Sequence, residues 1–92
     1  MEEKFLTLHP QGKKGVNINK AKYETMKKTI LDLLGKGELN YNELTVAVQR
    51  KLKGKFEGSI PWYMEGTKLD LEARGIIERV EGEKYQVYRA KR

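Results

Sequence analysis

Apolar residues recur at the spacing of an α-helix along three stretches of the chain, and glycine-rich segments separate these stretches. The first stretch covers residues 20–35 and follows Asn19, whose side chain suits the N-cap position. Its apolar residues fall on one stripe, which consists of Tyr23, Met26, Ile30, Leu33 and Leu34. We therefore expect an amphipathic helix that buries this stripe and leaves its lysines in solvent.

The second helix is expected over residues 41–53. Asn40 and Glu43 have the spacing of a capping box, in which the side chain of each residue accepts a hydrogen bond from the backbone N–H of the other. The inward face is predicted to consist of Leu44, Ala47, Val48 and Leu52. Leu39, which precedes this helix, is expected to enter the core in an extended conformation.

The third helix is expected over residues 59–75, and a β-hairpin over residues 76–89 follows it. Ser59 suits the N-cap position, and Pro61 falls in the first turn, where a missing N–H costs no intrahelical bond. Gly75 suits the left-handed residue that ends a helix.

This third helix is apolar on two nearly opposite sides. Met64 and Leu71 belong to the side that is expected in the main core. The other side carries Trp62, Leu69 and Ala73, although a surface helix needs only one apolar face. We therefore expect Trp62 and Leu69 to lie at an interface with the N-terminal arm, the hairpin or another subunit.

Residues 1–19 form an arm with less regular patterning. Two short strands are expected at residues 5–8 and 16–18, and a turn-rich basic loop joins them. The arm is expected either to pack on its own domain or to cross to a partner in a dimer.

The order of these elements, together with the segment LDLEARGIIERV at residues 69–80, resembles the junction of recognition helix and wing in winged helix–turn–helix proteins. The resemblance covers residues 20–89 and implies one α+β domain over residues 1–92, with three helices, a two-stranded wing and the arm. Over residues 9–90 the chain also resembles an uncharacterised family of small bacterial and archaeal proteins, through the segments GVNINKAKYETM, NELTVAV and SIPWYMEGTKLDLEARGIIERV. This second resemblance implies a compact domain and no particular activity.

The chain carries 19 basic and 13 acidic residues, a formal net charge of +6. An excess of this sign favours a polyanion or an acidic protein surface as partner. The third helix is an exception, because Glu65, Asp70 and Glu72 outnumber its basic residues. The sequence has no long apolar run, so it predicts neither a signal peptide nor a membrane span, and a cytoplasmic location is expected.

The winged-helix resemblance implies binding of double-stranded DNA, as a homodimer and in transcription regulation. In such complexes the third helix enters the major groove and basic residues around it contact phosphates. The candidates on the third helix are Tyr63 and Lys68. The candidate phosphate contacts flank that helix: Arg50, Lys51, Lys53 and Lys55 before it, and Lys84 and Arg89 in the wing.

A second interpretation is a winged-helix protein–protein interaction module that does not bind DNA and that uses the Trp62 face. The acidic residues of the third helix favour it, because like charges repel and carboxylates are unfavourable near phosphates. The net charge and the cations of the wing favour DNA. The sequence leaves both interpretations open.

Residues with catalytic or cofactor-binding chemistry are few. The chain has no cysteine, His9 is its single histidine, and no phosphate-binding GxxxxGK[ST] segment occurs. Lys13 and Lys14 are expected to form a flexible basic turn. We therefore expect no enzymatic activity, no metal site and no cofactor.

Overall fold

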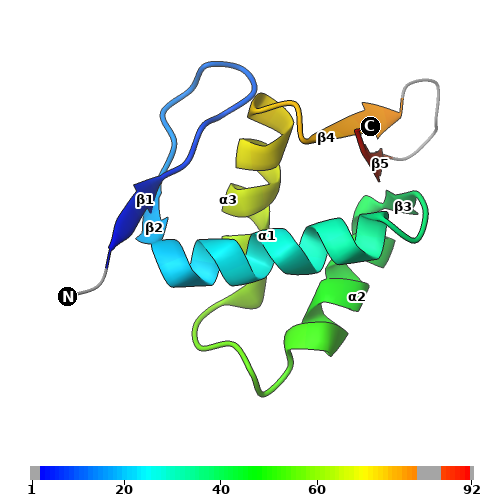
Figure 1. Ribbon diagram of the computed structural model, residues 1–92, viewed down its shortest axis with the longest axis horizontal. Helices are drawn as coiled ribbons and strands as arrows, with labels where there is room; N and C mark the ends of the chain where they lie inside the picture. Colours follow the sequence, from blue (N-terminus) through cyan, green and yellow to red (C-terminus); the bar gives the residue numbers. More distant parts are fainter. Residues whose placement is uncertain (1–2, 81–85, 92) are drawn as a thin grey trace.

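The computed structural model describes residues 3–80 and 86–91 of the chain. Its architecture is α+β, with three helices around one core and two small antiparallel sheets at their edges (Figure 1). The helices are α1 (Lys20–Leu34), α2 (Tyr41–Leu52) and α3 (Ile60–Ala73). Each begins and ends within two residues of the range expected from the apolar pattern. No helix in the described part of the chain is long and apolar enough to cross a membrane.

Local capping explains where the second and third helices begin and where the third one ends. The Ser59 side chain accepts a hydrogen bond from the Trp62 N–H at 3.3 Å. The predicted capping box is confirmed, since Asn40 Oδ1 accepts from the Glu43 N–H at 2.7 Å and Glu43 Oε1 accepts from the Asn40 N–H at 3.0 Å. α3 ends before Gly75, whose φ of 73° is a left-handed conformation that glycine adopts without strain.

The described residues form five strands: β1 (Lys4–Leu6), β2 (Asn17–Asn19), β3 (Leu39–Asn40), β4 (Ile77–Val80) and β5 (Val87–Ala90). β1 and β2 pair as an antiparallel hairpin, and the other sheet has the strand order β3-β5-β4. Leu39 of β3 lies opposite Tyr88 of β5, so the extended segment before α2 adds a third strand to the expected two-stranded wing. This order of helices and strands is compatible with a winged-helix-like fold.

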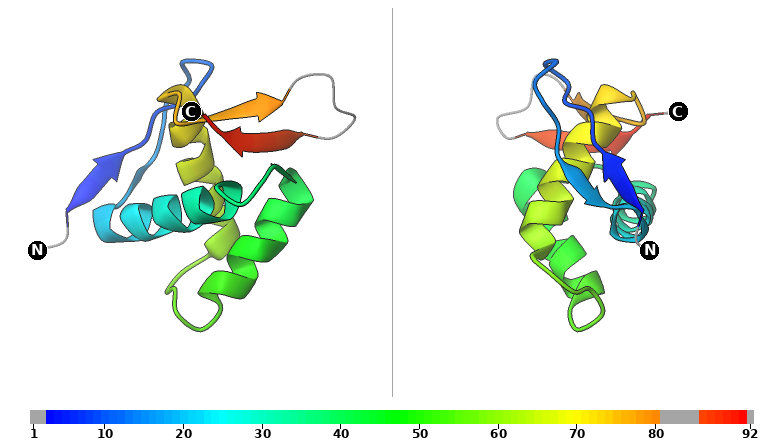
Figure 2. Two further views of the ribbon diagram at one scale, coloured as in Figure 1. Left: turned by 45° about the vertical axis from the view of Figure 1, so that its right-hand side comes forward. Right: turned by 90° about the vertical axis from the view of Figure 1, so that its left-hand side faces the viewer.

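One apolar core joins the three helices to the three-stranded sheet. Its buried residues come from all of these elements: Met26, Ile30, Leu34, Leu44, Val48, Leu52, Met64, Leu71, Ile77 and Tyr88. The predicted core positions Met64 and Leu71 are confirmed, with 1% and 0% of their surfaces exposed. The core holds α3 between α1, α2 and β4, and the N-terminal hairpin lies on another side of α3 (Figure 2).

The hairpin of β1 and β2 packs on its own domain. Phe5 of β1 stacks on Tyr23 of α1, with ring centroids 4.1 Å apart. The loop between the strands passes along α3, where a Cβ atom added to Gly66 would lie 3.5 Å from Val16 Cγ2. Within the hairpin, no residue with a side chain fits in place of Gly15, because a Cβ atom there would lie 1.8 Å from the Thr7 carbonyl oxygen.

The buried carboxylate of Asp70 in α3 joins the hairpin to two helices. It accepts hydrogen bonds from the Leu8 N–H at 2.8 Å, from the Tyr23 hydroxyl at 2.5 Å and from Arg74 Nε at 2.9 Å. Asp70 is fully buried, so these donors replace the water that its charge would otherwise require. Burial and the neighbouring carboxylate raise the pKa of Tyr23 well above its ordinary value, which keeps the phenol a donor to Asp70.

We expect Asp70→Ala to lower the free energy of unfolding by about 3 kcal/mol or more, because the Tyr23 hydroxyl and the Leu8 N–H would lose their acceptor inside the protein. Tyr23→Phe removes one donor together with its hydrogen bond and should cost about 1 to 2 kcal/mol. Urea unfolding followed by circular dichroism gives both values. Equal losses in the two variants would show that the carboxylate does not join the three elements.

Candidate nucleic-acid interface

α3 presents little of its surface to solvent. Pro61 and Trp62 in its first turn are exposed, while the other residues of the helix are buried or half-buried. Tyr63, which is predicted to contact bases, is half-buried against the core. The hairpin lies in front of α3 in the right-hand view of Figure 2. α3 can therefore contact a ligand with its N-terminal end, but it has no exposed face along its length.

Lys68 is buried, with 1% of its surface exposed, so the prediction that it reaches DNA from an exposed face of α3 is wrong. Its Nζ donates a hydrogen bond to the Tyr88 hydroxyl at 3.1 Å. It also lies 3.6 Å from a carboxylate oxygen of Glu65, 3.7 Å from one of Glu72, and 4.7 Å from the centre of the Tyr88 ring. These partners offset the loss of water around the ammonium group and join α3 to β5.

The predicted phosphate contacts in the wing do not form a free basic surface. Arg89 of β5 is exposed, but its Nε lies 2.6 Å from Glu78, and its guanidinium also reaches Glu38 at 3.7 Å. The two carboxylates weaken the attraction of Arg89 for a phosphate. Lys84 lies outside the described residues.

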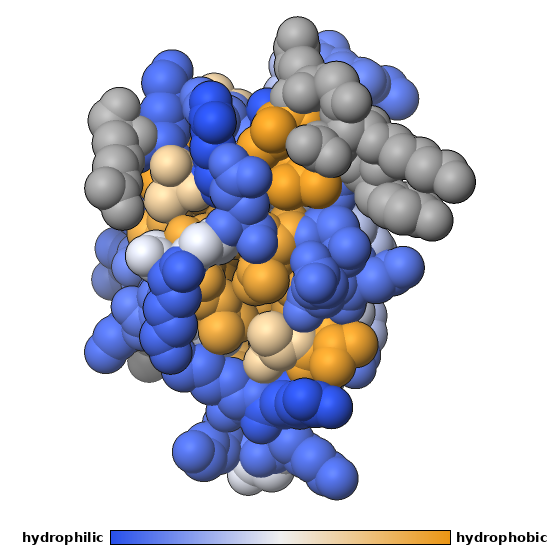
Figure 3. Space-filling model, turned by 90° about the vertical axis from the view of Figure 1, so that its right-hand side faces the viewer, coloured by the Kyte–Doolittle hydropathy of each residue, from blue (hydrophilic) through white to orange (hydrophobic). Residues whose placement is uncertain are grey.

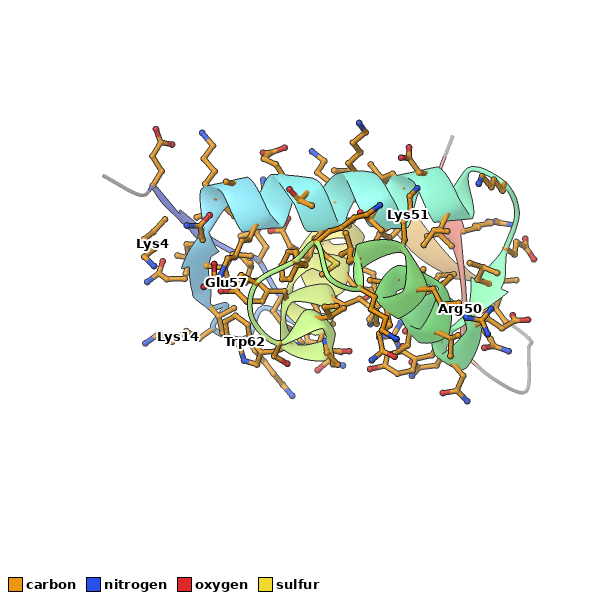
Figure 4. All side chains as sticks on the ribbon, turned by 90° about the horizontal axis from the view of Figure 1, so that it is seen from below. Lys4, Lys14, Arg50, Lys51, Glu57 and Trp62 are labelled. Atoms are coloured by element: carbon orange, nitrogen blue, oxygen red, sulfur yellow. The ribbon has the colours of Figure 1, made fainter. Side chains whose placement is uncertain are left out.

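Positive charge with no carboxylate partner among the described residues gathers where α2 ends and the loop to α3 begins. Arg50, Lys53 and Lys55 are exposed, and none of them forms an ion pair with a described residue. Lys51 is exposed as well, and its Nζ lies 3.5 Å from Asp32 of α1 in a pair that is open to solvent. Figure 4 shows Lys51 pointing toward α1 and Arg50 on the other side of α2. Exposed pairs of this kind are weak, so Lys51 stays available to a phosphate.

Aromatic contacts hold the loop that carries Lys53 and Lys55. Gly54 turns the chain after α2 with a φ of 75°. Phe56 then packs against Tyr63 of α3, edge to face, with ring centroids 5.2 Å apart. Because both rings also contact the core, the loop has a defined position relative to the first turn of α3.

Lys22 of α1 also belongs to this region, although no pattern in the sequence placed it there. Its Nζ lies 5.2 Å from the centre of the Tyr63 ring and 5.9 Å from the centre of the Phe56 ring. The contact depends on how α1 packs against the loop, which local patterns do not reveal. We name this set of cations the loop-side basic surface: Lys22, Arg50, Lys51, Lys53 and Lys55.

The two predicted interface residues of α3 have different surroundings. Leu69 is half-buried beside the tip of the hairpin, where it lines an open hollow of about 400 Å³ together with His9 and Glu72. Trp62 keeps 49% of its surface exposed and meets Tyr63 edge to face, with ring centroids 4.9 Å apart. The hairpin thus covers α3 at Leu69, which belongs to the second apolar side of the helix, and leaves Trp62 on the same side exposed.

His9 takes part in the turn of the hairpin, where its Nδ1 accepts a hydrogen bond from the Gln11 N–H at 3.1 Å. Over residues 3–80 and 86–91, no group of three or more histidine, aspartate or glutamate side chains is arranged to hold a metal ion.

These features define a small α+β protein with three helices, two antiparallel sheets and a basic surface at the junction of α2 and α3. The chain belongs to a family of unknown function (DUF6958), which it matches over residues 4–88. This agrees with the resemblance to an uncharacterised family that the sequence suggested. No curated protein matches the chain.

We expect Lys68→Met to lower the free energy of unfolding by about 2 to 4 kcal/mol, because Glu72 Oε2 would stay buried while Arg79 reaches only the other oxygen of that carboxylate. Lys55→Met, at an exposed lysine that pairs with no described carboxylate, is the matched control and should change stability by no more than about 0.5 kcal/mol. Chemical unfolding near neutral pH measures both. If the two variants were equally stable, the ion pairs of Lys68 with Glu65 and Glu72 would not contribute to stability.

Proposed function

We propose that this protein binds double-stranded DNA through the loop-side basic surface. The observation that carries the proposal is the group of exposed cations Arg50, Lys53 and Lys55, which pair with no described carboxylate. In helix–turn–helix proteins, the N-terminal end of the helix that follows this junction contacts the nucleic acid. The order of helices and strands supports the interpretation as a winged-helix domain.

Two further features of this region favour a polyanion. Lys28 is exposed one turn before Asp32, on the side of α1 that Lys51 approaches. The N-terminal end of α3, capped by Ser59, adds the positive end of the helix dipole. Asp32 and Glu57 are carboxylates of the same region, and the cations outnumber them.

In this proposal, contacts with phosphates supply most of the affinity, and α3 does not lie along a groove. Lys68 takes no part because it is buried, and Arg89 takes little because glutamates share its charge. Base contacts are left to the exposed first turn of α3. A protein of this kind would act in the cytoplasm, and a homodimer would double the number of phosphate contacts and suit a role in transcription regulation.

Fluorescence anisotropy of a labelled random-sequence duplex tests the proposal at about 50 mM and about 200 mM salt. We expect binding that weakens steeply with salt. The variant R50E/K53E/K55E should bind more than about tenfold more weakly, and the slope of log affinity against log salt should fall by about 2.7 if three phosphate contacts are lost.

The matched control is K13E/K36E/K91E, which changes the net charge by the same amount at exposed lysines outside the loop-side basic surface. It should retain most of the affinity. Equal losses in the two triple variants would reduce the effect to net charge alone. No binding by the wild-type protein at low salt would end the proposal.

The second candidate function is protein–protein interaction without DNA binding, and one surface favours it. Figure 3 shows apolar side chains exposed on the face that carries α2 and the three-stranded sheet. On α2, Val46 keeps 46% of its surface exposed and lines an open hollow of about 380 Å³ with Ala47 and Arg50. The partner in this second function is a second copy of the chain, because an apolar face is typical of homodimer interfaces.

Under this second function, the protein should dimerise in analytical ultracentrifugation, and Val46→Asp should make it monomeric because the charge would be buried at the interface. Thr25→Asp, which introduces the same charge at an exposed residue of α1 outside this hollow, serves as the control. A wild-type protein that stays monomeric at every concentration would exclude self-association through this face.

A further inference from the structure

Trp62 is the single tryptophan of the chain, and it lies at the open N-terminal end of α3 with 49% of its surface exposed. Single exposed apolar residues are common and need no explanation. Trp62 differs because its indole has a fixed support: it meets the Tyr63 ring at 4.9 Å, and Tyr63 in turn meets Phe56 at 5.2 Å. Since those two rings pack against the core, the indole is held from one direction and open in another.

Positive charge lies on two sides of this aromatic group. On the first side, Lys22 Nζ lies 5.2 Å from the centre of the neighbouring tyrosine ring, and Lys55 belongs to the loop that precedes α3. On the second side, the hairpin loop carries Lys14, which lies at the same end of the molecule as Trp62 in Figure 4. Glu57 lies at this end as well, but the lysines outnumber it.

The hairpin loop reaches α3 close to Trp62. Val16 lies against Gly66, one helical turn after Trp62, and Lys14 precedes Val16 by two residues. A nucleic-acid strand that crosses the indole therefore meets lysines of the α2–α3 loop on one side of the ring and a lysine of the hairpin on the other.

We propose that Trp62 stacks against an unpaired base, so that the preferred ligand of this surface is a nucleic acid with a single-stranded segment. The inference rests on the proposed nucleic-acid binding and narrows its ligand. In a single strand the flat faces of the bases are open to an aromatic ring, whereas in a duplex they are stacked on one another. The lysines on both sides contact the phosphates that flank the stacked base.

An acidic peptide matches the same positive charge but not the aromatic ring. Its carboxylates would pair with the lysines, and nothing in its charge would occupy the open face of the indole. A base and its phosphate supply both parts of the match, since every base has a π-face and every nucleotide carries a negative charge.

Intrinsic fluorescence tests the inference, because all tryptophan emission comes from Trp62. The wild-type protein is titrated with oligo(dT) and, separately, with a blunt duplex of equal length. We expect oligo(dT) to quench the emission and to bind more tightly than the duplex. Emission that oligo(dT) leaves unchanged, while anisotropy reports binding, would overturn the inference.

Trp62→Ala should weaken oligo(dT) binding about tenfold in anisotropy, while the salt slope stays the same, because stacking is lost and the phosphate contacts remain. Trp62→Phe keeps an aromatic ring and should fall between that variant and the wild type. Leu8→Ala, at an exposed apolar residue of the hairpin, is the matched control and should bind like the wild type. If Trp62→Ala fails to fold, Trp62→Phe and the quenching decide.

The outcomes separate this inference from the proposed function. If R50E/K53E/K55E loses oligo(dT) binding while Trp62→Ala binds like the wild type, stacking is wrong and the nucleic-acid surface stands. If neither oligo(dT) nor duplex binds at low salt, both fail. Polyglutamate that quenches the emission as strongly as oligo(dT) would also overturn the stacking, because it has no ring to offer.

Discussion

The buried carboxylate of Asp70 decides which surfaces of this protein stay open. A charge without water must be met by internal donors, and Asp70 finds them in the hairpin, in α1 and in Arg74 directly after its own helix. The hydrogen bond from the Leu8 N–H to Asp70 holds the N-terminal hairpin along α3, and the hairpin covers one side of the helix. The sequence suggested that α3 exposes a face that contacts DNA bases, but only the first turn of α3 is exposed.

Lys68 turns a second charge of the same helix inward, toward Tyr88 and two glutamates. α3 thus uses one buried anion on its hairpin side and one buried cation on its sheet side. Both charges lie in the C-terminal half of the helix and connect it to elements far away in the sequence. The acidic and basic residues of α3 are consequently a poor guide to the potential that a ligand would meet.

The attraction of the exposed cations for a polyanion depends on whether each cation is paired with a carboxylate as well as on how many cations there are. Arg89 shares its charge with Glu78 and Glu38, whereas Arg50, Lys53 and Lys55 meet no described carboxylate. The surface best suited to a polyanion therefore moves from the wing and the face of α3 to the junction of α2 and α3. Trp62 lies beside that junction and adds an aromatic surface to the charge.

The sequence by itself determined the three helices, the capping box of Asn40 and Glu43, the glycine after α3 and the core positions Met64 and Leu71. These features depend on spacing and on neighbours within a few residues, which the sequence contains in full.

Only the tertiary structure decided the fate of the charged side chains. Lys68 follows Met64 by four residues and so shares its inward face, but a lysine is buried only when distant partners such as Tyr88 surround its ammonium group. The pairing of Arg89 with Glu78 and the approach of Lys22 to the α2–α3 loop depend in the same way on how elements pack. Charge interactions act across space, and a linear pattern records only the part of them that is close in sequence.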